Sequence, residues 1–121
     1  MRLADVQLTF RERILIARVT GEIDRSNAGE LRTAITEATP NDAFGVVLDL
    51  SDVDYIDSAG IHLLYRLGES LRNRGQTLRI VVPPRSPSSD ALRLAGVGRQ
   101  VDMVDELDEG VRATAGAANG Q

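Results

Sequence analysis

The chain of 121 residues has the length of one domain, and a domain of this size buries enough surface to fold without a disulfide or a metal. Its net charge of −4 disfavours nucleic acid and anionic membranes as partners, and its 3% aromatic content leaves few side chains for base stacking. Cysteine is absent and no apolar run approaches the ~20 residues of a membrane span, so we expect a soluble, cytoplasmic protein with no cofactor and no metal site.

Two strands joined by a tight turn open the chain. Val6, Leu8 and Phe10 alternate along a first strand and are expected to share one of its faces. Residues 11–13 make the turn, and residues 14–21 form a second strand. Strands joined this closely pair antiparallel.

A first helix follows a loop at residues 22–26. Asn27 and Glu30 have the spacing of a capping box, so the helix is expected to begin there. Its buried stripe is predicted to be Leu31, Ile35 and Ala38, and a proline at position 40 ends it.

The middle of the chain predicts a strand, a helix and a second strand. Residues 44–51 are a continuous apolar run, which is typical of a strand buried on both faces. Residues 58–74 have leucines at helical spacing, and Gly75 stands where a left-handed cap belongs. Residues 77–83 form the next strand, so the unit is a right-handed crossover between parallel strands.

The last third predicts a short helix at residues 86–96, a weak strand at 101–104 and a final helix from residue 105. The fold class is therefore α/β, a single mixed sheet of about five strands with four helices in the order β-β-α-β-α-β-α-β-α. We expect one domain over residues 1–115 and a disordered tail over residues 116–121.

Ser58 is the candidate functional residue. The segment 51–57 is expected to be a loop that leaves the carboxyl end of a buried strand and delivers Ser58 to a helix start, where backbone N–H groups favour an anion. Asp57 can cap the helix by itself, so the adjacent hydroxyl is not needed for capping. Asp52 and Asp54 add more acidic side chains than a turn requires, and Ala59 with Gly60 is expected to leave the hydroxyl unshielded. The alternative is that Ser58 or Asp57 is only a helix cap.

The segments around this serine resemble the STAS family, whose name joins sulfate transporters and anti-sigma factor antagonists. The resemblance rests on Asp49-Leu50-Ser51, on Asp57-Ser58-Ala59-Gly60-Ile61 and on the earlier turn Gly21-Glu22-Ile23-Asp24. It covers nearly the whole chain. One departure is Ala59, where many relatives have a second hydroxyl; another is Gly29, inside the first helix, to which we assign no function from the sequence.

The resemblance implies an anti-sigma factor antagonist that is not itself an enzyme. Its partners would be an anti-sigma factor with serine kinase activity, which phosphorylates Ser58 and then releases the protein, and a protein phosphatase that restores it. The oligomeric state stays open between a monomer and a weak dimer. The expected partner-binding residues are Gly21, Glu22, Ile23, Asp24, Asp54, Asp57, Ser58, Ala59, Gly60, Ile61 and His62.

Another role within the same family stays open. Some relatives are scaffolds of stress-sensing complexes and others are accessory subunits of lipid transporters, and both bind proteins without this phosphorylation cycle. The intact Asp-Ser-x-Gly motif favours the switch. A sulfate-transporter tail is disfavoured because no membrane segment accompanies the domain.

Other chemistries fit the residues less well. A phosphoaspartate receiver needs a lysine, and all 14 basic residues here are arginine. The acidic segment lacks the glycine and the terminal glutamate of an EF-hand, which disfavours calcium. A serine hydrolase would need His62, the only histidine, as base for Ser58 at i and i+4, but there is no G-x-S-x-G elbow.

Overall fold

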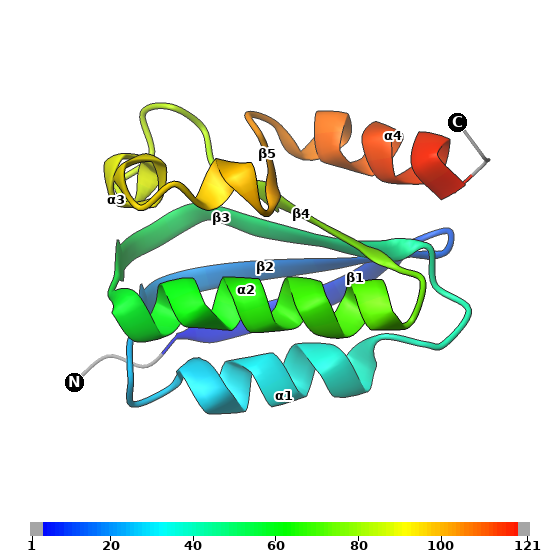
Figure 1. Ribbon diagram of the computed structural model, residues 1–121, viewed down its shortest axis with the longest axis horizontal. Helices are drawn as coiled ribbons and strands as arrows, with labels where there is room; N and C mark the ends of the chain where they lie inside the picture. Colours follow the sequence, from blue (N-terminus) through cyan, green and yellow to red (C-terminus); the bar gives the residue numbers. More distant parts are fainter. Residues whose placement is uncertain (1–3, 119–121) are drawn as a thin grey trace.

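The computed structural model describes residues 4–118 and confirms the expected fold class (Figure 1). Five strands form one sheet in the order β1-β2-β3-β4-β5; β1 pairs antiparallel with β2, and the other neighbours pair in parallel. The strands are β1 (Asp5–Arg11), β2 (Ile14–Ile23), β3 (Gly45–Ile56), β4 (Thr77–Val81) and β5 (Asp102–Val104). The helices are α1 (Ala28–Ala38), α2 (Ser58–Asn73), α3 (Ser89–Leu94), the 3₁₀ turn η1 (Val97–Arg99) and α4 (Leu107–Ala118).

The helices cover the two faces of the sheet unequally. Helices α1 and α2 lie side by side on one face, α3 and η1 join the same core, and α4 lies on the other face (Figure 1). Alternate strand residues explain the division, because side chains of a strand point to opposite faces. Leu15 and Leu48 belong to the larger core beneath α1 and α2, whereas Ile14 and Val47 belong to the smaller core beneath α4.

Strand β3 is longer than the sequence predicts and includes most of the expected loop at residues 51–57. Val53 and Ile56 are buried, and they pair with Gly21 and Ile23 at the extended end of β2. The ladder has register shifts in this region, which hide the alternation of apolar and polar residues that would have revealed a strand. Helix α2 therefore follows the strand directly at Ser58.

The first strand and the last helix each show a feature that the sequence does not predict. On the edge strand β1, Val6 packs against the core, but Leu8 and Phe10 are 38% and 55% exposed. Helix α4 extends to Ala118, so the predicted tail is helical over residues 116–118; residues 119–121 lie outside the described part of the chain.

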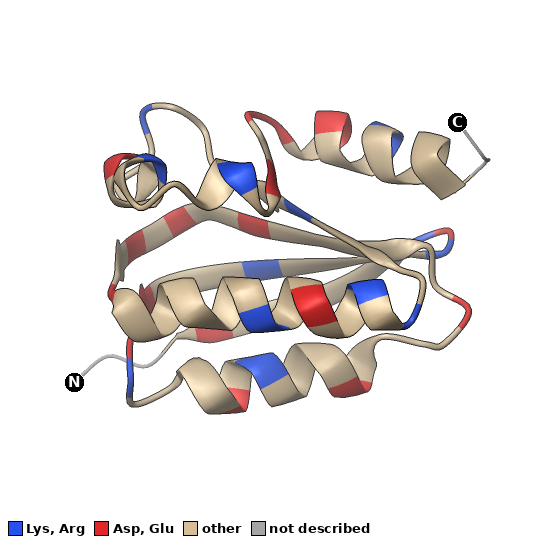
Figure 2. Ribbon diagram, viewed as in Figure 1, with Lys and Arg blue, Asp and Glu red and all other residues tan. Residues whose placement is uncertain are grey.

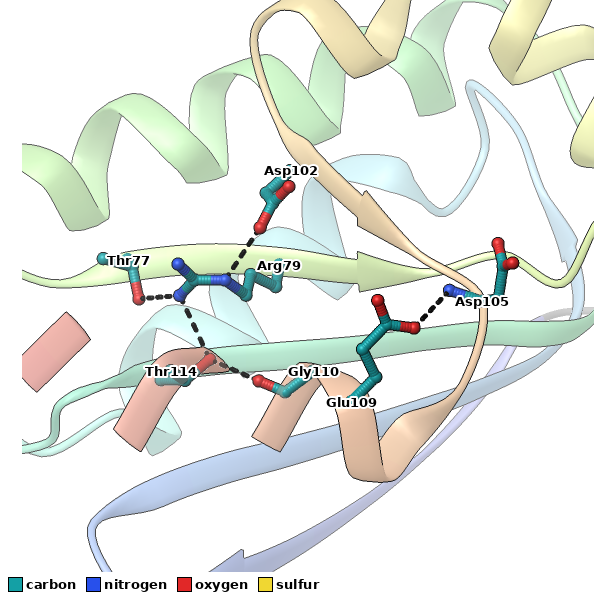
Figure 3. A network of polar contacts seen from close by, with 7 residues as sticks. All are labelled: Thr77, Arg79, Asp102, Asp105, Glu109, Gly110 and Thr114. Carbon is teal, nitrogen blue, oxygen red and sulfur yellow. Dashed lines mark hydrogen bonds and ion pairs between the residues drawn. The ribbon is translucent and has the colours of Figure 1, made fainter. Parts of the chain in front are cut away.

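Arg79 of β4 attaches α4 to the sheet (Figure 3). Its guanidinium donates to the carboxylate of Asp102 at 2.8 Å, to the hydroxyl of Thr77 at 3.2 Å and to that of Thr114 on α4 at 3.3 Å. Thr114 in turn donates to the carbonyl oxygen of Gly110 within α4. The guanidinium thus joins two neighbouring strands and the helix that covers them.

Candidate functional site

Ser58 is the first residue of α2, and it is exposed. The cap of the helix is Asp57, whose Oδ1 accepts the backbone N–H of Gly60 at 3.1 Å. Among the described residues, the hydroxyl of Ser58 has no hydrogen-bond partner. The capping function that would explain this serine structurally belongs to its neighbour, and the hydroxyl is free to react.

Gly60 allows the first turn of α2 to pack closely on the sheet. A Cβ atom at this position would lie 2.4 Å from Cγ1 of Ile56 and 3.0 Å from Cγ2 of Ile23. A glycine therefore lets the helix approach the ends of β2 and β3 closely. Gly60 is buried, so what the structure shows for this residue is close packing beneath the helix start.

The acidic residues before α2 do not form one cluster around Ser58. Asp52 makes an ion pair with Arg18 of β2, and its hydrogen bond and charge raise the pKa of that guanidinium. Asp54 lies on β3 and is exposed, while Asp57 is half-buried as the helix cap. Of the three carboxylates, only Asp57 adjoins the hydroxyl, as the preceding residue and cap.

The end of β2 and the turn that follows it lie against the start of α2, as two hydrogen bonds show. The N–H of Asp57 donates to the carbonyl of Ile23 at 3.2 Å, and the N–H of Arg25 donates to Oδ2 of Asp57 at 3.3 Å. The two sequence motifs thus meet in space.

Asn27 closes this turn, and the predicted capping box was wrong. Its Oδ1 accepts the N–H of Asp24 at 3.0 Å, and its Nδ2 donates to the carbonyl of Glu22 at 2.8 Å. The side chain makes no cap hydrogen bond to α1 because it is engaged with the turn that precedes the helix.

Asp24 is held in its charged form by Ser26. The hydroxyl of Ser26 donates to Oδ1 of Asp24 at 2.5 Å, and its backbone N–H donates to the same atom at 2.9 Å. These hydrogen bonds lower the pKa of the Asp24 carboxyl from its ordinary value. The turn therefore presents a fixed negative charge beside the start of α2.

The expected partner-binding residues separate by exposure into three groups. Asp54, Ser58 and His62 are exposed, whereas Glu22, Asp24, Asp57, Ala59 and Ile61 are half-buried. Gly21, Ile23 and Gly60 are buried, and Ile23 has no exposed surface at all. These last three residues shape the surface from beneath, and the partner-binding role of the whole set stays a prediction.

A groove between α1 and α2 begins at Ser58, and the sequence reasoning missed it. It has a volume of about 450 Å³, and its basic lining residues are Arg25, Arg32, His62 and Arg66. We name it the arginine groove. Gly29, unexplained in the sequence, also lines it. The signal that could have revealed the groove is the helical spacing of Arg32 to Gly29 and of Arg66 to His62, which places each pair on one helix face.

Metal binding and membrane crossing find no support in the described part of the chain. Residues 4–118 contain no group of three or more His, Asp or Glu side chains placed to hold a metal ion. None of the helices within this range has the length and the apolar content to cross a bilayer.

The fold and the site together define a small α/β domain that presents a serine hydroxyl at the first turn of a helix. Comparison with known proteins gives the family, because the STAS domain is matched over residues 5–110. This chain belongs to the STAS domain family.

The relatives and solved structures agree with this assignment. The anti-sigma-F factor antagonist RsfB of Mycobacterium tuberculosis is 26% identical over 104 residues, which cover 85% of this chain and 83% of that protein. An anti-sigma factor antagonist from Mycobacterium paratuberculosis superposes with a TM-score of 0.82 at 23% identity, over 93% of this chain and 95% of that one. The unphosphorylated form of the anti-sigma factor antagonist SpoIIAA gives 0.73 at 18% identity, over 93% and 97%. The two structures show that the fold is shared.

Proposed function

We propose that this protein is an anti-sigma factor antagonist controlled by phosphorylation of Ser58. The unmodified form binds an anti-sigma factor that is also a serine kinase, and the bound sigma factor is released. Phosphorylation of Ser58 ends the interaction, and a protein phosphatase restores it. The protein itself performs no catalysis and acts in the cytoplasm.

The observation that supports this proposal most directly is the hydroxyl of Ser58, exposed and without a hydrogen-bond partner among the described residues. A kinase can reach this oxygen without unfolding the helix, since Asp57 keeps the cap. The names of relatives such as RsfB and SpoIIAA point to the same class of partner.

Electrostatics allow a modification at this position to act as a switch. A phosphoryl group adds about −1.5 to −2 charges. At ~6 Å from a carboxylate of the partner, with an effective dielectric constant near ~20, each pair of unit charges costs about 3 kcal/mol. Salt that halves the total of about 5 kcal/mol still leaves roughly a hundredfold loss of affinity. No refolding is required.

The experiment is site mapping with a kinase partner. The protein is incubated with candidate anti-sigma kinases and ATP, and the phosphate is located by mass spectrometry. We expect modification of Ser58, none in Ser58→Ala, and normal modification in Thr9→Ala, a control at an exposed hydroxyl on β1. Phosphate on another residue, with Ser58 unmodified, would contradict the proposal.

The same variants test the scaffold role. Ser58→Ala is expected to keep partner binding, and Ser58→Asp to weaken it. A partner that binds both variants equally would support a STAS scaffold without a switch.

A further inference from the structure

The arginine groove is lined by three arginines that make no ion pair within residues 4–118. In residues 4–118, ion pairs engage the arginines at positions 11, 13, 18 and 79 only. Arg25, Arg32 and Arg66 are outside this set, although the chain as a whole is acidic. Figure 2 shows the contributing elements: the loop before α1, α1 itself and α2. Three guanidinium groups outside these ion pairs line one groove, and together they favour an anionic occupant.

Ser58 lies where such an anion would be attached. It lines the groove together with the three arginines, and it lines a second hollow with Arg25, Asp24 and Asp57. Arg25 and Ser58 both line the groove and the second hollow, so these two residues lie close together. His62 follows Ser58 by one helical turn on the same face of α2 and also lines the groove.

The groove has room for a phosphoryl group, because its volume is about 450 Å³ and small residues contribute to its lining. Ala28, Gly29 and Ala59 line it, and a Cβ added at Gly29 would meet nothing within 4 Å. The glycine within α1 costs helix stability of about 1 kcal/mol relative to alanine, and packing does not require it. Its effect is to add no side chain to this part of the groove lining.

We infer that the phosphoryl group of modified Ser58 is bound in the arginine groove, by Arg25 and His62 close to the serine and by Arg32 and Arg66 around it. This inference rests on the proposed phosphorylation of Ser58. The phosphate is favoured over a carboxylate of another protein because it is attached to the groove already and pays no cost of association. Guanidinium groups bind phosphate oxygens through paired, charge-assisted hydrogen bonds.

The inference adds a second element to the switch. In the unmodified protein the three arginines are displayed to a partner, and after modification they are engaged by the protein's own phosphate. Phosphorylation would then remove positive charge from the surface as well as add negative charge to it.

The test is a ³¹P NMR titration of protein that carries phosphoserine at position 58, incorporated during translation so that no kinase is needed. Nearby cations lower the second pKa of the phosphate, and Asp24 and Asp57 raise it. The decisive comparison is therefore between variants. We expect Arg25→Gln and Arg32→Gln each to raise this pKa by about 0.3–1 unit.

Arg112→Gln is the matched control, because it removes an exposed arginine on α4, which covers the opposite face of the sheet. This variant is expected to leave the phosphate pKa unchanged. The series is repeated with His62→Gln, which removes the single histidine of the chain from the comparison. Thermal melts check that each variant is folded.

Equal phosphate pKa values in Arg25→Gln, Arg32→Gln and the parent would show a phosphate in open solvent and would overturn the inference. Equal increases in these variants and in the control would do the same. The NMR comparison and the kinase experiment can fail separately, because phosphoserine is incorporated without a kinase. The comparison can show a groove-bound phosphate even if no kinase modifies Ser58 in the cell, and a confirmed kinase does not by itself place the phosphate in the groove.

Discussion

The carboxylate of Asp57 caps α2 through the N–H of Gly60 and also accepts the N–H of Arg25, whereas the hydroxyl of Ser58 stabilises neither contact. Two adjacent residues therefore differ in what they do for the fold. We expect Asp57→Ala to lower the free energy of unfolding by about 1–2 kcal/mol and Ser58→Ala to change it by less than about 0.5 kcal/mol. Urea denaturation measures both. A large loss of stability in Ser58→Ala would make the serine a structural residue.

Asp24 provides a test that depends on pH. Its pKa is lowered by Ser26, so the stabilisation from this carboxylate is present above the unfolded-state pKa of about 4 and is lost as the pH falls through the lower folded-state pKa. We expect Ser26→Ala to bring the pKa of Asp24 back toward its ordinary value. A ¹³C NMR titration of the side-chain carboxyl groups shows this directly. An unchanged pKa in the variant would mean that the hydroxyl does not hold the charge.

At the scale of the elements, the start of α2 depends on how closely the helix approaches β2 and β3. Gly60→Ala would place a methyl group against Ile56 and Ile23, so we expect a loss of about 1–3 kcal/mol in the free energy of unfolding. Gly29→Ala is the matched substitution in α1, where the added Cβ meets nothing, and it should stabilise the protein by about 0.5–1 kcal/mol. Chemical denaturation of both variants decides the point, and stabilisation by Gly60→Ala would show that the close approach is unimportant.

At the scale of the whole molecule, the sequence predicted the order of the elements and the fold class well. Continuous apolar runs and leucines at helical spacing are local signals, and they identified the inner strands and α2. The end of β3 was missed because the register shifts break the alternation around Val53 and Ile56. The bounds of α3 and of the final helix were predicted less accurately for a different reason, since these segments contain little apolar periodicity.

The candidate site could be predicted in part. Ser58 and its cap were found because both lie in one short motif, and Asp57 has the capping bond that the sequence suggested. The arginine groove has only a partial signal in the sequence, because helical spacing pairs Arg32 with Gly29 and Arg66 with His62 but does not bring the two helices together. Arg25, Arg32 and Arg66 come from a loop and two helices, and only the packing of α1 against α2 brings them to one place.

A phosphoryl group at position 58 is expected to stop the docking of a protein partner, and every other step of the proposed switch depends on this effect. The direct measurement is the affinity of one partner, captured with the unmodified protein, for the unmodified form and for the form that carries phosphoserine at position 58. Isothermal titration calorimetry at physiological salt gives both values. We expect the modified form to bind at least roughly a hundredfold more weakly. Affinities that agree within about twofold would contradict the account.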